Sequence, residues 1–260
     1  MPHIIWDWNG TLLDDTEAAL KTLNIMIERR GGKPIGMDFY LDTFAFPVRP
    51  FYDMIGIGAK SEEEWNEISR EYHETYLSQP KGLNAGAVAA LEAAKAAGCG
   101  QSMLSALRQD YLDVQIKEYG IDKYFDFVYG SNNLHGASKV DRARELIARL
   151  PAACSTSDIR HSTFPHPSPI HNSSFIIPRS PFPDPSPIHN SSFIIHHSSS
   201  VPHLVMIGDA VHDKEVADAL GVPCVLVAQG SHAAWRLRAV APTADTLEEA
   251  VELALQVTVA

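Results

Sequence analysis

The segment HIIWDWNGTLLDD, residues 3–15, decides the fold. Its first five residues form a short apolar run that ends on the carboxylate of Asp7, the pattern of a buried strand that delivers an acid at its carboxyl end. Gly10 then marks a turn, and apolar residues recur at helical spacing between residues 20 and 27 until two glycines stop the pattern. The segment therefore predicts a strand, a polar turn and a helix, in that order.

Strand and helix patterns alternate along the rest of the chain. Strand-like apolar runs lie at 101–104, 125–129, 203–207 and 222–228, and helical stripes lie at 86–97, 112–119, 140–150 and 216–220. This alternation is typical of a parallel sheet with helices on both faces. Residues 15–84 lack convincing strands and carry a further helical stripe from Trp65 to Tyr76, so we expect a helical insert after the first strand.

Four polar features follow the predicted strands. They are Asp7 to Thr11, Ser105, Lys139 just before a helix, and Asp209 with Asp213 after the run at 203–207. Because the carboxyl ends of parallel strands share one edge of an open sheet, we expect these features to converge there. Carboxylates, a hydroxyl and an ammonium form a set suited to phosphoryl transfer, in which a metal and the lysine offset the phosphate charge and a carboxylate attacks phosphorus.

Composition excludes several other classes of protein. The chain of 260 residues carries a formal net charge of −11, which argues against a nucleic-acid partner held by its phosphates. No apolar stretch approaches the roughly 20 residues of a membrane span, and no secretory signal opens the sequence. Three scattered cysteines are too few for a disulfide framework. We expect a cytoplasmic protein, either a monomer or a homodimer, with a small phosphorylated metabolite as its partner.

The tract at 151–200 differs in kind from the rest of the chain. Residues 164–177 recur at 182–195 with one change, and ten of the 17 prolines lie between residues 151 and 202. The tract has no buried apolar period, so its composition predicts a low-complexity, mostly disordered insertion. We expect it to leave the core at the edge opposite the polar features, so that removal of residues 154–200 leaves activity intact.

The four features, in this order, resemble those of the haloacid dehalogenase superfamily hydrolases, of the phosphoglycolate phosphatase-like branch. The family pattern is Asp-x-Asp-x-Thr, then Ser or Thr, then Lys, then Gly-Asp-x-x-x-Asp, and the similarity covers all but the 151–200 tract. The resemblance implies an α/β fold: a Rossmann-like core with a parallel sheet and an α-helical cap. The core is expected at 1–14 and 85–260, interrupted by the insert at about 152–201, and the cap at 15–84.

The resemblance also implies roles for individual residues. It makes Asp7 the nucleophile, Asn9 and Lys139 further catalytic residues, Thr11, Ser105, Ala106 and Lys139 the phosphate-binding residues, and Asp7, the Asn9 carbonyl, Asp209 and Asp213 the Mg²⁺ site. The implied reaction is hydrolysis of a small phosphomonoester, with 2-phosphoglycolate as a candidate, through an aspartyl-phosphate. Arg49 in the expected cap is a candidate grip for a substrate carboxylate, with an ordinary surface arginine as the alternative.

Asn9 departs from the family pattern. The family has an acid at this position, which protonates the leaving group and then activates water, and an amide does not exchange a proton at neutral pH. General acid–base help contributes roughly 10² to 10⁴-fold to a rate. Three interpretations therefore stay open: slow turnover, another base such as His212 or Asp14, or a protein that binds phosphate ligands or regulates without hydrolysing them.

Overall fold

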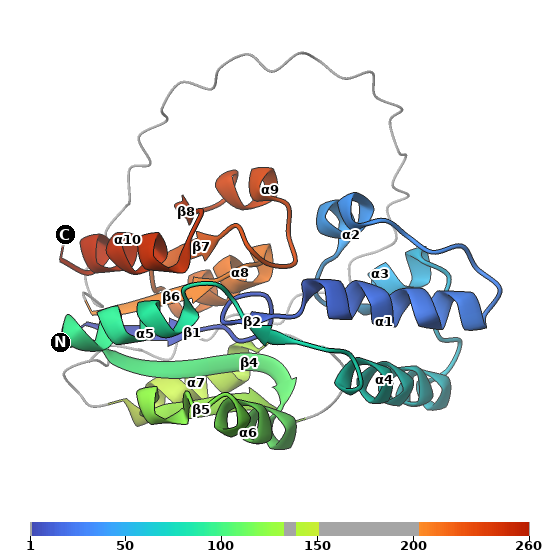
Figure 1. Ribbon diagram of the computed structural model, residues 1–260, viewed down its shortest axis with the longest axis horizontal. Helices are drawn as coiled ribbons and strands as arrows, with labels where there is room; N and C mark the ends of the chain where they lie inside the picture. The colour runs from blue at the N-terminus through green and yellow to red at the C-terminus, as the bar shows by residue number, and fades with distance from the viewer. Residues whose placement is uncertain (1, 133–138, 151–202, 260) are drawn as a thin grey trace, which may run out of the picture. The chain divides into compact units, whose positions relative to one another are not determined.

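The computed structural model describes residues 2–132, 139–150 and 203–259 (Figure 1). Six strands form one parallel sheet, in the order β5 (Phe127–Ser131), β4 (Gly100–Arg108), β1 (His3–Trp6), β6 (Leu204–Gly208), β7 (Cys224–Val227) and β8 (Thr243–Ala244). β1 is fully buried between β4 and β6, as its run of apolar residues predicts for a central parallel strand. The predicted insertion at 151–200 lies outside the described residues.

Helices cover both faces of the sheet. One face packs against α5 (Ala87–Ala96), α6 (Gln109–Glu118) and α10 (Leu247–Val259), with the short 3-10 helix η1 (Asp122–Tyr124) beside them. The other packs against α7 (Val140–Arg149), α8 (Val211–Leu220) and α9 (Ala234–Arg238). Each crossover helix runs back from the carboxyl edge of the sheet to its amino edge. α7 therefore ends, and β6 begins, at the edge opposite the carboxyl ends of the strands.

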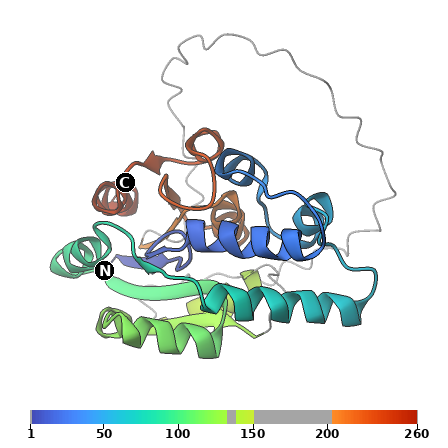
Figure 2. The same cartoon turned by 45° about the vertical axis from the view of Figure 1, so that its right-hand side comes forward.

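A second helical unit follows β1. The short strand β2 (Leu13–Asp14) pairs antiparallel with β3 (Gly82–Leu83), and between them lie α1 (Thr16–Arg29), α2 (Met37–Thr43), α3 (Arg49–Met54) and α4 (Glu62–Leu77). These four helices have their own apolar core, centred on residues such as Leu23, Phe51 and Trp65. Figures 1 and 2 show them gathered beyond the carboxyl ends of the strands, with α1 and α4 side by side. We call α1–α4 the cap.

The α/β fold class predicted from the sequence is confirmed. The division into a core at 1–14 and 85–260 and a cap at 15–84 stays a prediction, although the β2–β3 pair falls at both of its boundaries. The strand expected at 101–104 is longer than predicted, because β4 continues through residue 108 with an irregular register beside β5. Among the described residues, no helix is long and apolar enough to cross a membrane.

Candidate active site

The predicted polar features meet at the carboxyl ends of the central strands. β1 is the point from which strand order runs outward in both directions, β4 and β5 on one side and β6 to β8 on the other. Such a switch point leaves a crevice at the carboxyl edge of an open parallel sheet. Asp7 follows β1 directly, Asp209 follows β6, and Lys139 caps the amino end of α7.

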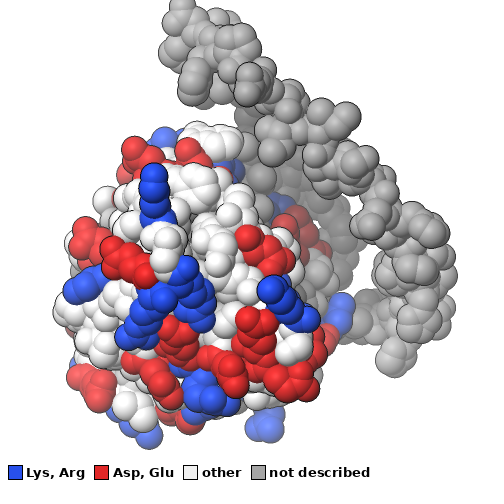
Figure 3. Space-filling view, turned by 90° about the vertical axis from the view of Figure 1, so that its right-hand side faces the viewer, with Lys and Arg blue, Asp and Glu red and all other residues white. Residues whose placement is uncertain are grey.

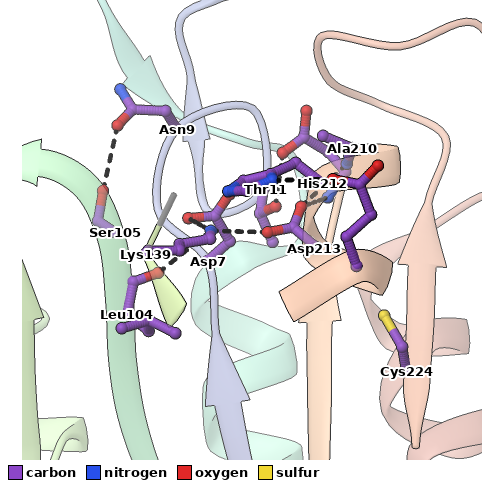
Figure 4. Close-up of polar contacts among 12 residues, drawn as sticks. Asp7, Asn9, Thr11, Leu104, Ser105, Lys139, Ala210, His212, Asp213 and Cys224 are labelled. Atoms are coloured by element: carbon purple, nitrogen blue, oxygen red, sulfur yellow. Dashed lines mark hydrogen bonds and ion pairs between the residues drawn. The ribbon is translucent and has the colours of Figure 1, made fainter. Parts of the chain in front are cut away.

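An ammonium group joins two of the carboxylates. Lys139 Nζ lies 2.8 Å from Asp7 Oδ1 and 2.6 Å from Asp213 Oδ1, and all three side chains are nearly inaccessible to solvent. Asp213 Oδ2 accepts hydrogen bonds from the backbone N–H groups of Asp209 and Ala210, at 3.1 and 3.0 Å. Figure 4 shows Lys139 reaching between Asp7 and Asp213. The lysine thus holds the Asp7 carboxylate in a fixed position at the end of β1.

Asp209 is held by two hydroxyl groups. Thr11 Oγ1 donates to its Oδ1 at 3.0 Å, and the hydroxyl and backbone N–H of Ser231 donate to its Oδ2 at 2.6 and 2.7 Å. Gly10, with φ of 73°, lies so close that a side chain there would collide with the Asp209 carboxylate. The glycine after Asn9 is therefore required both by its backbone conformation and by the approach of Asp209.

Burial shapes the electrostatics of this cluster. Burial, followed by the charge of Asp213, raises the pKa of Asp7 well above its ordinary value and raises the pKa of Asp209 to about 6. Burial would also raise the pKa of Asp213, but the charge and hydrogen bond of Lys139 outweigh it and lower that pKa. A bound cation would favour the ionised forms of Asp7 and Asp209.

The same three carboxylates fit a divalent metal ion. One oxygen each of Asp7, Asp209 and Asp213 lie within 4.8 Å of one another, and all three residues are buried. When ionised, the three carboxylates carry three negative charges against the one positive charge of Lys139. A doubly charged cation would balance the remainder. Carboxylate and carbonyl oxygens are the ligands that Mg²⁺ takes in proteins. The donor set therefore fits the predicted metal, with the Asn9 carbonyl as the further ligand that the sequence suggests.

The side chain of Asn9 faces the cap. Its Nδ2 donates to Asp15 Oδ2 at 2.8 Å and to the Tyr76 hydroxyl at 2.9 Å, while that hydroxyl donates to Asp15 Oδ2 at 2.6 Å. The backbone N–H of Gly10 donates to the other oxygen of Asp15, at 2.7 Å. Burial raises the pKa of Asp15. A carboxyl group thus lies directly beside the amide that stands where the family has an acid.

Asp15 and Tyr76 were missed by the sequence analysis, although both line the cavity described below. Of the two alternative bases, Asp14 is exposed on β2, whereas His212 is buried and lines the cavity. Burial, together with the charge of Lys139, lowers the pKa of His212. The adjacent acidic pair at residues 14 and 15 was the signal in the sequence: Asp14 ends β2, whereas Asp15 is the N-cap of α1 and is buried.

Of the predicted phosphate-binding residues Thr11, Ser105 and Ala106, only Ala106 lines the cavity described below. Ser105 is buried beside it; its Oγ accepts from the Leu107 N–H at 3.1 Å and lies 3.4 Å from Asn9 Oδ1. Thr11 directs its hydroxyl to Asp209, so in this structure it supports a carboxylate.

The structure does not bring Arg49 to the site. Arg49 begins α3, forms an exposed ion pair with Glu62 at 2.8 Å, and lies over the Trp65 ring at 4.7 Å from its centroid. It does not line the cavity, whereas its neighbour Val48 does. The contacts with Glu62 and Trp65 fit the alternative of a surface arginine, and a role of Arg49 in substrate binding stays a prediction.

A cavity of about 130 Å³ connects the carboxylates with the cap. Its floor includes Asp7, Asp209 and Lys139, and its walls come from the four cap helices and the segment at 44–48. α9 contacts the cap beside it: the Arg236 guanidinium donates to the carbonyls of Leu41 and Phe44, at 2.8 and 2.9 Å. The cavity thus adjoins the Asp7 carboxylate and has room for a small ligand.

Comparisons with known proteins agree with this geometry. A sequence model of haloacid dehalogenase-like hydrolases matches residues 4–150, and a second model, described as HAD-hydrolase-like, matches residues 184–252. A curated protein from Caldanaerobacter subterraneus subsp. tengcongensis, named as a pyrophosphatase, is 22% identical over 130 residues, which are 49% of this chain and 57% of that protein. The chain thus spans little more than half the length of this curated relative.

Solved structures with the same fold include three proteins of different descriptions. They are a protein described as a phosphatase from Clostridium acetobutylicum (TM-score 0.67, 16% identity, 98% of each chain), one described as a phosphoglycolate phosphatase from Lactobacillus delbrueckii subsp. bulgaricus (0.64, 16%, 98% and 99%), and protein tyrosine kinase A of Mycobacterium tuberculosis (0.64, 20%, 97% and 98%). At these identities the likeness shows the fold alone. Because the first sequence model covers more than half of the 260 residues, this chain belongs to the haloacid dehalogenase-like hydrolases.

Proposed function

We propose that the protein is a Mg²⁺-dependent phosphatase that hydrolyses a small phosphomonoester through an aspartyl-phosphate on Asp7. The observation that carries this proposal is the buried Asp7 carboxylate at the end of β1, fixed by Lys139 at 2.8 Å and open to the cavity. A nucleophilic carboxylate beside a cation is the arrangement that covalent phosphoryl transfer requires.

The chemistry follows from the positions of these groups. A carboxylate oxygen of Asp7 attacks phosphorus, the bond from phosphorus to the ester oxygen breaks, and the alcohol leaves with a proton. Water then attacks phosphorus, the bond to Asp7 breaks, and inorganic phosphate is released. Lys139 offsets the charge of the phosphoryl oxygens, and a Mg²⁺ held by Asp7, Asp209, Asp213 and the Asn9 carbonyl supplies further charge compensation. The cap excludes water from the cavity.

Asn9 supports the second candidate function, a phosphate-binding or regulatory protein with impaired turnover. Its amide cannot supply the proton that the leaving alcohol needs, and its Nδ2 is engaged by Asp15 and Tyr76. In the phosphatase proposal that proton therefore comes from a group other than Asn9.

The proposal also includes the cytoplasmic location, the absence of nucleic-acid partners and the monomeric or dimeric state that we expect from the sequence. The face of the cap in Figure 3 mixes acidic and basic side chains.

Hydrolysis assays with Mg²⁺ separate the two functions. We expect the native protein to release phosphate from p-nitrophenyl phosphate, and Asp7→Asn to lose this activity because the nucleophile is gone. Asp38→Asn, which alters an exposed acid on α2 that does not line the cavity, is the matched control and should retain it. If the native protein is as inert as Asp7→Asn while Asn9→Asp turns substrate over, the binding function is correct and the phosphatase proposal is wrong.

A further inference from the structure

The walls of the cavity are aromatic. Rings from the cap line it, among them those of Tyr40, Phe44, Phe46, Tyr52, Trp65 and Tyr72. They come from α2, the segment that follows it and α3, which are consecutive in the sequence, and from α4. Aromatic rings that line a ligand cavity bind apolar and flat groups by burial and by stacking. The cap therefore presents a surface suited to a ring above the nucleophile.

Ring pairs give these walls defined orientations. Tyr40 stacks on Phe44 with centroids 5.0 Å apart and planes at 23°. Phe46 stacks on the buried ring of His212 at 5.1 Å and 28°. On the α4 side, Tyr72 lies nearly parallel to Tyr76, at 5.7 Å and 11°. Rings that already support one another keep their faces in place, so a ligand ring meets a preformed surface.

Positive charge is scarce in the same cavity. Among the described residues that line it, Lys139 is the only lysine or arginine, and it is paired with Asp7 and Asp213. Arg49 points elsewhere, to Glu62. An anionic group placed against the cap would lose its hydration without gaining a cation, and burying an unpaired charge is strongly unfavourable.

We propose that the organic part of the substrate is an uncharged, ring-bearing group, so that the protein acts on aryl or arylalkyl phosphomonoesters and discriminates against phosphorylated carboxylic acids such as 2-phosphoglycolate. This inference rests on the proposed function. The phosphoryl group lies at Asp7 and Lys139, and the ring extends from the ester oxygen between the wall at 44–46 and α4. The cavity thus replaces the arginine grip expected from the sequence with aromatic contacts.

The test compares esters of similar primary alcohols, so that leaving-group chemistry does not decide the result. We measure kcat/KM with Mg²⁺ for 2-phenylethyl phosphate, ethyl phosphate and 2-phosphoglycolate. The native protein should prefer 2-phenylethyl phosphate over each of the others by about tenfold or more, the effect expected for burial of a ring. Equal or higher kcat/KM for 2-phosphoglycolate would overturn the inference and leave the phosphatase proposal standing.

Variants locate the preference in the cap. Phe46→Ala and Tyr72→Ala should each lower the ratio of kcat/KM for 2-phenylethyl phosphate to that for ethyl phosphate by about three- to tenfold. Phe39→Ala is the matched control, because Phe39 lies on α2 beside Tyr40 but is exposed and does not line the cavity. An unchanged ratio in both cavity variants, with folding verified by thermal unfolding, would contradict the placement of the ring.

A binding measurement covers the case in which no ester is hydrolysed. That outcome would refute the phosphatase proposal, so calorimetry then compares 2-phenylethylphosphonate with phosphonoacetate in the presence of Mg²⁺. The aromatic walls predict at least about tenfold tighter binding of the phenyl compound. Tighter binding of phosphonoacetate would show that the inference itself is wrong.

Discussion

Replacing Asn9 with aspartate introduces a half-buried carboxylate beside the buried carboxylate of Asp15. Asn9 Nδ2 donates to Asp15 Oδ2 at 2.8 Å, so in Asn9→Asp one carboxylate oxygen meets another at that separation. Tyr76 cannot relieve both, because its single hydroxyl proton already goes to Asp15 at 2.6 Å. The change restores the acid of the family pattern, yet the structure predicts that it destabilises this chain.

The size of the effect follows from the distance. Two unit charges separated by the 2.8 Å between Asn9 Nδ2 and Asp15 Oδ2 repel by about 6 kcal/mol at an effective dielectric constant near 20. The pair can avoid this by retaining one proton. Keeping one carboxyl group protonated at pH 7 costs about 4 kcal/mol when its unfolded pKa is about 4. The retained proton forms a hydrogen bond between the two carboxyl groups, which offsets part of this cost. We therefore expect Asn9→Asp to lower the free energy of unfolding by about 2 to 4 kcal/mol at pH 7.

The sign of the pH dependence is also fixed. A carboxyl pair whose folded pKa lies above its unfolded pKa binds more protons in the folded state, so stability falls as pH rises above about 4. Urea unfolding of the native protein and of Asn9→Asp at pH 5 and pH 7 measures this. The difference between the two proteins should grow by up to about 3 kcal/mol over that range, since each pH unit contributes about 1.4 kcal/mol.

A double-mutant cycle tests the assignment to Asp15. Asn9→Asp combined with Asp15→Asn exchanges the carboxylate and the amide, so the double variant should recover most of the lost stability. If Asn9→Asp is equally destabilising with and without Asp15→Asn, or not destabilising at pH 7, the reasoning from the contact is wrong. The same unfolding data are needed to interpret the activity assay, because an inactive Asn9→Asp protein is informative only when it is folded.

Four further changes test other contacts of the structure. Tyr76→Phe removes the hydroxyl that donates to buried Asp15 and should cost about 1.5 to 3 kcal/mol in urea unfolding, whereas a cost near zero would argue against the contact. Arg236→Ala removes two hydrogen bonds to cap carbonyls, so hydrogen exchange should quicken in α2 and stay unchanged in β1; equal exchange in α2 would count against this contact as a restraint. Burial lowers the pKa of His3 to about 4, below its ordinary 6.5. The neutral imidazole therefore contributes its full share of the free energy of unfolding above pH 6.5, and as much as about 3 kcal/mol of it is lost as pH falls to 4. His3→Gln should flatten the dependence of stability on pH between 4 and 6.5, and an unchanged slope would refute the assignment to His3. Mg²⁺ should raise the melting temperature of the native protein more than that of Asp209→Asn, and equal shifts would remove Asp209 from the metal site.

The fold was accessible from the sequence because its signals are local. The apolar run at 3–7 and the run at 203–207 each read as buried strands, and the alternation of strands and helices fixes a parallel sheet. Asp7, Lys139 and Asp213 follow predicted element boundaries, so the topology alone brings them to one edge. Glycine at residue 10 adds a signal of close approach, which the contact with Asp209 explains.

The cap was only partly accessible, because its side chains take their roles from tertiary packing. Four helices surround the cavity, and whether a residue such as Arg49 faces inward depends on the rotation of its helix against three neighbours. An arginine next to a cavity-lining valine reads the same in the sequence whichever way it points. The helical stripe from Trp65 to Tyr76 does not show which of its rings pack in the cap core and which line the cavity, and Trp65 does both.

The same limit explains why Asn9 was read as a defect in a motif. A linear pattern compares position 9 with the family and finds an acid missing, but it does not show which groups surround the side chain. In the fold, Asp15 and Tyr76 converge on the amide from β2–α1 and α4, 61 residues apart. An amide at position 9 is the residue that lets a buried carboxylate lie at position 15 without a second negative charge, since its N–H donates where an aspartate would repel. Asn9 and Asp15 are therefore one structural unit, and the effect of changing either depends on the other.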